Sequence, residues 1–551
     1  MLRAGSGWWV LAVAAMAWGQ VRPAAPHYAS IAGVVLDDAT GAPVPRAVVK
    51  LETKSADPSD AAAWTDDRGG FAFSRVPPGR YSLTAHRDGY EAARFGTVSR
   101  EQPPEVLSLA TAEDRRVTLR MRPVGSISGT VTGPDGDPLP GANMSLLVAG
   151  YNRRKPRYWQ QHGAQTDARG RYRIGGLPAG KYILMANAQW QRPAAMAEVV
   201  RGQAPEESKY APLFYPNVDR IAAATPIVLA PGKNLEGFDF QLSPQPVGKI
   251  AGKVMLPADA GPNAQIMVQI REEDQTVPGS TMGMGANQGD GAFELNGVLP
   301  GRYLVSAVFN GQSRQYRGVE HVEVGHAPTQ VTLHLEPGVE LAGSVRLEGN
   351  SGGEPPHFRV ILVAGDGLPS FGGQLEAEVK PDGSFRIPNV LPGVWDIDVQ
   401  PVPEGGFIKS MRLGNQDVLT EDMVVESTTS APLNIVLSTR GAVIDGAVTV
   451  AGGERAKKAY VVLAPSGPRE KVWTFYRVIP VDESGHFEFK GVMPGAYTLY
   501  ALARMDSDPS QDPDFLKPLA GHGEAIDVPE GSHVTRDVRL VPETPLEAET
   551  K

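Results

Sequence analysis

One sequence cassette recurs five times along this chain of 551 residues and constrains its fold more than any other feature. Each copy opens with a strand-like segment of the form apolar-x-Gly-x-Val. The glycines at the centres of these openings are Gly33, Gly129, Gly252, Gly343 and Gly446. The copies are on the order of 100 residues apart, which is the length of a domain and too long for one turn of a solenoid. The sequence therefore predicts an array of five similar domains.

Two turns that end in an aromatic residue follow every opening. The first has the form Gly-x-aromatic, and the second places proline and glycine shortly before the ring. The two rings are ten residues apart in every copy: Phe71 and Tyr81, Tyr172 and Tyr182, Phe293 and Tyr303, Phe385 and Trp395, Phe487 and Tyr497. Because a glycine removes a side chain from a sheet face, we expect a large ring, that of the second turn, to pack over each opening glycine.

Apolar residues alternate with polar ones within each cassette. Val117, Leu119 and Met121 are one example, and Val331, Leu333 and Leu335 are another. A period of two is typical of strands with one buried face, and no helical period of comparable length is present. Asp-Gly pairs between these segments supply the turn chemistry of hairpins. The chain is therefore predicted to be all-β, with two-sheet sandwiches of about seven strands.

Short joints that contain proline or glycine mark the boundaries between copies. The predicted organisation is a signal peptide at 1–19, sandwiches at 27–123, 124–246, 247–338, 339–440 and 441–543, and a disordered tail at 544–551. The second sandwich carries the longest insertion. Joints of a few residues do not permit free tumbling, so we expect the sandwiches to lie end to end in a semi-rigid rod.

The N-terminal segment has the pattern of a secretory signal. Arg3 precedes an apolar run from Trp8 to Trp18, and Ala17 and Gly19 supply small residues for cleavage. The run is shorter than the roughly 20 residues that a bilayer-spanning helix needs. We expect an exported protein, extracellular or in the periplasm or cell envelope, with no transmembrane segment in the mature chain.

Composition excludes several classes of chemistry. The chain contains no cysteine, which rules out disulfides, thiol catalysis and cysteine-ligated zinc. Its net charge of −9, with acidic and basic residues interspersed, gives no general affinity for nucleic-acid phosphates. We therefore expect no nucleic-acid partner.

The cassette resembles the bacterial carboxypeptidase regulatory-like domain. The resemblance rests on the I-x-G-x-V opening, the turn from Asp37 to Ala47, and the two aromatic turns, and it covers nearly all of the mature chain. Two further stretches, Leu213–Pro216 and Lys409–Gly414, resemble long exported proteins of this family of the acidobacterial type. The resemblance implies five tandem transthyretin-like (prealbumin-like, Ig-like) β-sandwiches related to carbohydrate-binding-like modules. In this family the domain accompanies a carboxypeptidase and is not itself catalytic.

No catalytic or metal-ligating motif is complete. None of the ten histidines has glutamate three residues later, as a zinc carboxypeptidase would require. Ser351 in a Gly-rich hairpin and His86 belong to different predicted domains, so they cannot form a hydrolase pair. Asp66, Asp67 and similar carboxylates offer oxygen ligands for calcium without a complete loop, and we interpret them as turn residues. The sequence predicts no enzyme, no cofactor and no metal.

The second cassette carries the best candidates for binding. A segment rich in cations and aromatic residues, 151–159, contains Tyr158 and Trp159, and the insertion that follows contains Trp190 and Tyr215. Exposed rings beside amides and arginines suit sugar faces or extended peptides. A structural role is the alternative, in which Tyr158 and Trp159 begin a strand and Tyr215 closes a core.

The sequence thus favours a non-enzymatic, exported binding or structural rod whose leading ligand is polysaccharide. The first alternative is an accessory protein that docks onto an envelope enzyme or transporter by strand addition at a sandwich edge. A carboxypeptidase-associated activity is the remote alternative.

Overall fold

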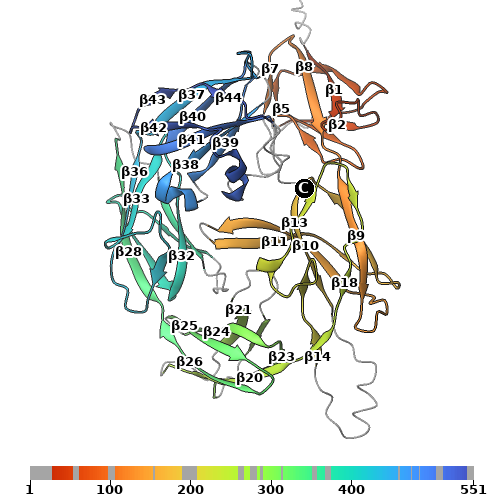
Figure 1. Ribbon diagram of the computed structural model, residues 1–551. Helices are drawn as coiled ribbons and strands as arrows, with labels where there is room; N and C mark the ends of the chain where they lie inside the picture. The colour runs from red at the N-terminus through yellow and green to blue at the C-terminus, as the bar shows by residue number, and fades with distance from the viewer. Residues whose placement is uncertain are drawn as a thin grey trace, which may run out of the picture. The chain divides into compact units, whose positions relative to one another are not determined.

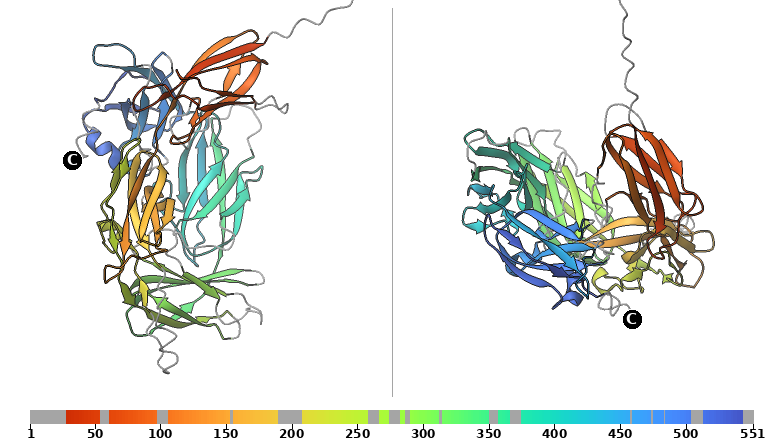
Figure 2. Two further views of the ribbon diagram at one scale, coloured as in Figure 1. Left: turned by 90° about the vertical axis from the view of Figure 1, so that its right-hand side faces the viewer. Right: turned by 90° about the horizontal axis from the view of Figure 1, so that it is seen from above.

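The computed structural model describes the chain from residue 28 to residue 542 with internal gaps. The described ranges are 28–53, 61–96, 106–152, 155–188, 208–257, 266–273, 282–285, 290–311, 314–349, 357–365, 374–456, 459–472, 475–482, 484–503 and 513–542. Within them the chain forms strands and short 3-10 helices and no α-helix, which confirms the all-β prediction (Figure 1). Figure 2 shows the same strand-and-turn composition from two further sides. No helix in these ranges is long and apolar enough to cross a membrane. The predicted signal peptide and C-terminal tail lie outside the described residues.

The chain divides into two compact units, Met1–Arg122 and Pro123–Lys551. Ten of the eleven sheets in the described ranges fall into five pairs, one in the first unit and four in the second, and each pair encloses a cluster of buried apolar side chains. We call these pairs sandwiches 1 to 5 in chain order. The predicted boundaries between the sandwiches of the second unit remain predictions.

The five sandwiches share one arrangement of strands. The opening strand lies in the first sheet between an antiparallel strand and a parallel strand from the end of the cassette, and in sandwich 4 two further strands extend this sheet beyond the parallel one. The second sheet contains the strand that leads away from the aromatic turns, and a short strand forms one of its edges. Sandwich 1 is built from β1 (Ala29–Asp37), β2 (Val48–Thr53), β3 (Ala61–Trp64), β4 (Gly70–Val76), β5 (Gly79–His86), β6 (Ala93–Arg94), β7 (Leu107–Leu109) and β8 (Asp114–Met121).

Sandwich 2 contains the longest hairpin of the described chain and a small extra sheet made of β14 and β19. Its elements are β9 (Gly125–Thr132), β10 (Asn143–Asn152), β11 (Lys155–Gln165), β12 (Arg171–Leu177), β13 (Gly180–Asn187), β14 (Ser208–Tyr210), β15 (Leu213–Phe214), the 3-10 helix η1 (Ile221–Ala223), β16 (Ile227–Leu229), β17 (Asn234–Leu235), β18 (Phe240–Gln241) and β19 (Pro244–Pro246).

Sandwiches 3 and 4 consist of strands alone in the described ranges. Sandwich 3 comprises β20 (Gly248–Met255), β21 (Ile266–Glu272), β22 (Met282–Gly285), β23 (Ala292–Val298), β24 (Gly301–Asn310), β25 (Gln315–Val324), β26 (Thr329–His334) and β27 (Glu336–Pro337). Sandwich 4 comprises β28 (Val339–Glu348), β29 (Arg359–Ala364), β30 (Gln374–Glu378), β31 (Ser384–Val390), β32 (Gly393–Gln400), β33 (Phe407–Leu413), β34 (Gln416–Asp417), β35 (Met423–Val425) and β36 (Leu433–Ser438).

Sandwich 5 adds the 3-10 helices η2 and η4 to the shared arrangement. Its elements are β37 (Ala442–Thr449), β38 (Tyr460–Pro465), η2 (Gly467–Lys471), β39 (Arg477–Pro480), β40 (His486–Val492), β41 (Gly495–Leu502), η4 (Pro513–Leu519), β42 (Glu524–Val528), β43 (His533–Thr535) and β44 (Val538–Arg539).

The alternating pattern of the sequence places the cores as predicted. In β8, Val117, Leu119 and Met121 are buried and the residues between them are exposed. β8 pairs in parallel with β1 along its whole length, from Asp114 opposite Ser30 to Met121 opposite Asp37. Burial of one face per strand is what a period of two requires.

A ring does lie over each opening glycine, but it is not the ring that the sequence suggested. Gly33 lies directly opposite Phe71 across the β1–β4 pair, and Gly252 lies opposite Phe293 across the β20–β23 pair. The covering ring is therefore that of the first aromatic turn. The physical reason is register, since the antiparallel pairing brings that residue level with the glycine, and ring spacing along the chain does not reveal pairing.

The second aromatic residue of each copy closes its own turn. The hydroxyl of Tyr81 donates to the backbone oxygen of Pro77, four residues earlier, at 2.8 Å. In sandwich 4 the indole N–H of Trp395 makes the equivalent bond to Leu391, also at 2.8 Å. The same bond is made by the hydroxyls of Tyr182, Tyr303 and Tyr497. A buried ring with one polar atom satisfied in this way holds the turn against the core.

The face of the second sheet that points away from the core, which we call the outer face, differs between sandwiches. In sandwich 2 it carries a second apolar cluster under η1: Leu147, Ile183, Phe214 and Ile221. In sandwich 5 it carries one beside η4: Val462, Leu502, Leu519 and Val541. These two sandwiches therefore cover their outer faces with their own chain.

Candidate functional site

The β10–β11 hairpin of sandwich 2 carries the first two residues predicted to bind. The strands contain ten and eleven residues, compared with six and four in β2 and β3, which occupy the same places in sandwich 1. The pairing runs from Asn143 opposite Gln165 to Asn152 opposite Lys155, with one irregularity between Leu146 and Leu147. This long ladder places residues of the predicted binding segment in regular strand structure.

Tyr158 and Trp159 lie on opposite faces of β11 because they are neighbours in one strand. Tyr158 packs against the outer-face cluster that contains Leu147 and Phe214, and its burial raises the pKa of its hydroxyl. The ring of Trp159 lies over Gly150 on the other face. The predicted alternative, in which both residues belong to a strand, describes their backbone correctly.

Trp159 is the member of this pair that stays accessible. Its side chain is 43% exposed. A Cβ atom added to Gly150 would lie 1.9 Å from the indole, so only glycine leaves room for the ring at this place. The indole thus rests on the backbone of the hairpin, and part of its surface is available for contact.

Tyr215 belongs to the core of sandwich 2. Its ring lies 4.9 Å from that of Phe238 and 6.4 Å from that of Phe240, measured between centroids. The peptide bond that joins it to Pro216 is cis. This arrangement matches the structural alternative for Tyr215. Trp190, the fourth predicted residue, lies outside the described residues.

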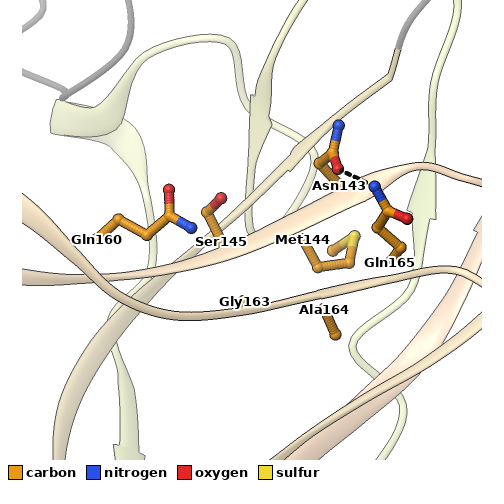
Figure 3. A pocket seen from close by; sticks show the side chains of 7 residues that line it. All are labelled: Asn143, Met144, Ser145, Gln160, Gly163, Ala164 and Gln165. Carbon is orange, nitrogen blue, oxygen red and sulfur yellow. Dashed lines mark hydrogen bonds between the residues drawn. The ribbon is translucent and has the colours of Figure 1, made fainter.

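An open depression of about 510 Å³ lies on the same hairpin (Figure 3). Side chains of Asn143, Ser145, Gln160 and Gln165 supply its polar lining, and Met144, Gly163 and Ala164 complete it. The register places Asn143 opposite Gln165 and Ser145 opposite Gly163. Three amides and a hydroxyl therefore converge on one patch of sheet.

Two of these amides are oriented by contacts within the depression. The side-chain nitrogen of Gln165 donates to the side-chain oxygen of Asn143 at 2.9 Å, as the dashed line in Figure 3 shows. The amide nitrogen of Gln160 lies 3.1 Å from where a Cβ atom of Gly163 would be. The sequence prediction missed these residues. The glutamines at 160, 161 and 165 were the available signal, and they were outweighed by the aromatic residues beside them.

Carboxylates with shifted pKa values have structural partners. Asp445 accepts hydrogen bonds from the Thr535 hydroxyl at 2.7 Å and from the ring of His533 at 3.0 Å, and His486 lies 3.5 Å away. These contacts, that of Thr535 first, lower the pKa of Asp445. These contacts tie Asp445 of β37 to β43, the strand that pairs with it in parallel.

The turn carboxylates that offered oxygen for calcium are hydrogen-bonded to their own turns. Asp66 accepts the backbone N–H groups of Arg68 and Gly70 at 2.8 and 2.7 Å. Among the described residues, no group of three histidine, aspartate or glutamate side chains is arranged to hold a metal ion. Ser351 lies outside the described residues.

Sequence comparison finds the carboxypeptidase regulatory-like domain in two places, residues 30–120 and 126–207. These stretches correspond to sandwich 1 and to the first part of sandwich 2. No curated protein matches the chain.

Solved structures with similar chain paths include three pilins. The minor pilin GBS52 of Streptococcus agalactiae is 16% identical, covers 39% of this chain and 96% of its own, and gives a TM-score of 0.22. A streptococcal ancillary pilin is 12% identical and covers 55% and 98%, with a TM-score of 0.21. The shaft pilin SpaA of Lactobacillus rhamnosus GG is 10% identical and covers 42% and 99%, with a TM-score of 0.18. Similarities this distant carry no argument about function.

Proposed function

We propose that this chain, in which residues 30–120 and 126–207 match the carboxypeptidase regulatory-like domain, is a non-enzymatic exported protein that binds polysaccharide through sandwich 2. The observation that supports the proposal most directly is the amide-lined depression on β10 and β11. Amides donate and accept hydrogen bonds at once, which is what sugar hydroxyl groups need. Export is proposed from the signal-like N-terminal sequence, and the rod-like role from the short joints.

The depression has the chemistry of a weak, extended contact with a sugar chain. It is open, and Asn143, Ser145, Gln160 and Gln165 line it without a charged side chain. A neutral, hydroxyl-rich ligand therefore loses little hydration when it exchanges water for these groups. Trp159 on the other face of the same hairpin offers a ring for the apolar face of a sugar.

The test is retention of the full chain on insoluble neutral polysaccharides. We expect Gln160→Ala combined with Gln165→Ala to weaken binding at least about fivefold, the effect of losing one important interface side chain. Trp159→Ala should weaken binding further if the polysaccharide wraps around the edge of the hairpin. Val228→Ala is the matched control, because Val228 is a 53% exposed apolar residue of sandwich 2 outside the depression.

Two outcomes would reject carbohydrate binding at this site. One is equal retention of wild type, the double glutamine variant and the control. The other is no retention of the folded wild-type chain on any neutral polysaccharide tested. The second outcome favours the alternative function, docking onto an envelope protein, which co-purification from an envelope fraction then tests.

A further inference from the structure

The outer face of sandwich 1 carries the most exposed indole among the described residues. Trp64, at the end of the edge strand β3, is 70% exposed. It contributes to no apolar cluster, whereas its neighbour Ala63 packs on the core. A single exposed apolar residue is ordinary on a protein surface, so this indole has weight only together with the charged side chains on the same face.

The sheet brings other side chains level with this indole. Val48 of β2 lies opposite Trp64 on one side and opposite His86 of β5 on the other. Adjacent strands are about 4.8 Å apart, so Trp64 and His86 mark a row about 10 Å long. In the next row Lys50 lies between Ala62 and Thr84.

This outer face is basic although the protein as a whole is acidic. Among the residues that the structure describes, Lys50, Arg80 and Arg94 are exposed on this face together with one carboxylate, that of Glu52. A net charge of −9 over the whole chain makes this local excess of cations notable.

The corresponding faces in two other sandwiches are covered by the chain itself. Sandwich 2 covers its outer face with the cluster under η1, and sandwich 5 covers its own with the cluster beside η4. Among the described residues of sandwich 1 no such cluster is formed on this face. The same position in the fold is therefore filled by an apolar cluster in two copies, and the described residues of the first copy form none there.

We propose that this face binds an acidic polysaccharide, with the indole of Trp64 against a sugar ring and Lys50 and Arg80 against carboxylates of the polymer. The indole supplies the flat apolar surface, and the cations supply charge complementarity. A polymer with one carboxylate per sugar can form ion pairs with a few cations that are spread over several strands. Double-stranded nucleic acid, with a charge about every 1.7 Å, is repelled by the acidic remainder of the protein. The inference does not require the site in sandwich 2.

Binding of the full chain to polygalacturonate, by calorimetry at low and physiological salt, tests the proposal. We expect Trp64→Ala to weaken binding about tenfold or more, as for a central aromatic anchor. Trp64→Phe, which keeps an aromatic face, should recover part of it. Lys50→Gln combined with Arg80→Gln should weaken binding and reduce its salt dependence.

Two controls separate this site from the rest of the chain. Val424→Ala changes an exposed apolar residue of sandwich 4, outside both proposed sites, and should leave polygalacturonate binding unchanged. Because Trp64 lies outside the core, circular dichroism of Trp64→Ala should match wild type. The double glutamine variant, Gln160→Ala with Gln165→Ala, is the second control. Loss of its retention on neutral polysaccharide, with polygalacturonate binding intact, would show that the two sites are separate.

Any of four results would overturn the proposal. The first is no binding of polygalacturonate by wild type, and the second is equal binding by wild type and Trp64→Ala. The third is equally tight, Trp64-dependent binding of neutral dextran, which would remove the role of charge. The fourth is equally tight, Trp64-dependent binding of oligothymidylate, which would identify the face as a nucleic-acid site.

Discussion

At the scale of single residues, the five opening glycines are enclosed from two sides. A Cβ atom on Gly252 would lie 2.4 Å from the backbone oxygen of Val331 and 2.7 Å from the ring of Phe293. Val331 belongs to the parallel neighbour and Phe293 to the antiparallel one. The ring of Phe293 can move only by displacing other side chains of the core. The carbonyl of Val331 cannot move without breaking backbone hydrogen bonds between the strands. Glycine at this place is therefore a packing requirement.

Gly252→Ala should destabilise sandwich 3. Overpacking of this kind costs about 1–3 kcal/mol. Hydrogen exchange measured on peptides from β20 and β23 should accelerate by about 5- to 150-fold. Gly325→Ala is the matched control in the same sandwich, because nothing lies within 4 Å of its Cβ position. Equal exchange in the two variants would refute the packing argument.

At the scale of elements, aspartates tie the turns between strands. Asp482, between β39 and β40, accepts the backbone N–H groups of His486 and Ser484 at 2.9 and 2.8 Å. These bonds, led by that of His486, lower its pKa below the ordinary value. The pKa values of Asp167 and Asp382 in the matching turns are lowered as well. The sequence predicted these turns because their Asp and Gly residues act locally.

The lowered pKa of Asp482 predicts a loss of stability in acid. Its ionised form stabilises the fold, so this contribution is present above about pH 4, the unfolded pKa, and is lost as pH falls through the native pKa. Asp482→Asn keeps an acceptor oxygen but cannot titrate. Thermal unfolding between pH 6 and 2 should therefore show a shallower acid decline in the variant. Asp527→Asn, on the exposed side of β42, should decline like wild type; identical slopes for all three proteins would contradict the assignment.

Longer-range features of the elements were less predictable. The alternating pattern located β8 and β26. Phe238, Phe240 and Leu242 alternate in the same way, but this segment forms a strand only at Phe240–Gln241. Phe238 instead packs against Tyr215, a contact supplied by the insertion of sandwich 2. The amide depression was missed because it depends on the pairing of β10 with β11, which composition does not encode. Trp64 was missed because a single tryptophan after three alanines gives no sign of which face it occupies.

At the scale of the whole molecule, polar contacts connect consecutive sandwiches of the second unit. The ammonium group of Lys409 lies 2.9 Å from a carboxylate oxygen of Glu348 and 3.0 Å from one of Glu530. Glu530 also accepts from Arg440 at 2.9 Å. Lys409 and Glu348 belong to sandwich 4 and Glu530 to sandwich 5. Lys409 lowers the pKa of both carboxyl groups, chiefly by hydrogen bonding.

Lys409→Met should loosen this junction. It removes the shared cation and leaves two carboxylates that repel each other. We expect trypsin to cleave after Arg440 about two to five times faster, since partly exposed ion pairs have modest effects that salt reduces. Lys490→Met, which breaks the ion pair with Glu488 inside sandwich 5, is the control. Cleavage at one rate in both variants would mean that the network does not hold the junction.

The parallel pairing of opening and closing strands also determines how a sandwich responds to tension. In each sandwich the opening strand is hydrogen-bonded in parallel to a strand near the end of the same cassette. Traction on the chain ends pulls two such strands in opposite directions along their length. The hydrogen bonds between the two strands are then loaded in shear. All of them bear the force together, whereas in a strand pair pulled apart from one end they would break one after another. These hydrogen bonds help each sandwich to resist extension, and no disulfide contributes because the chain contains no cysteine.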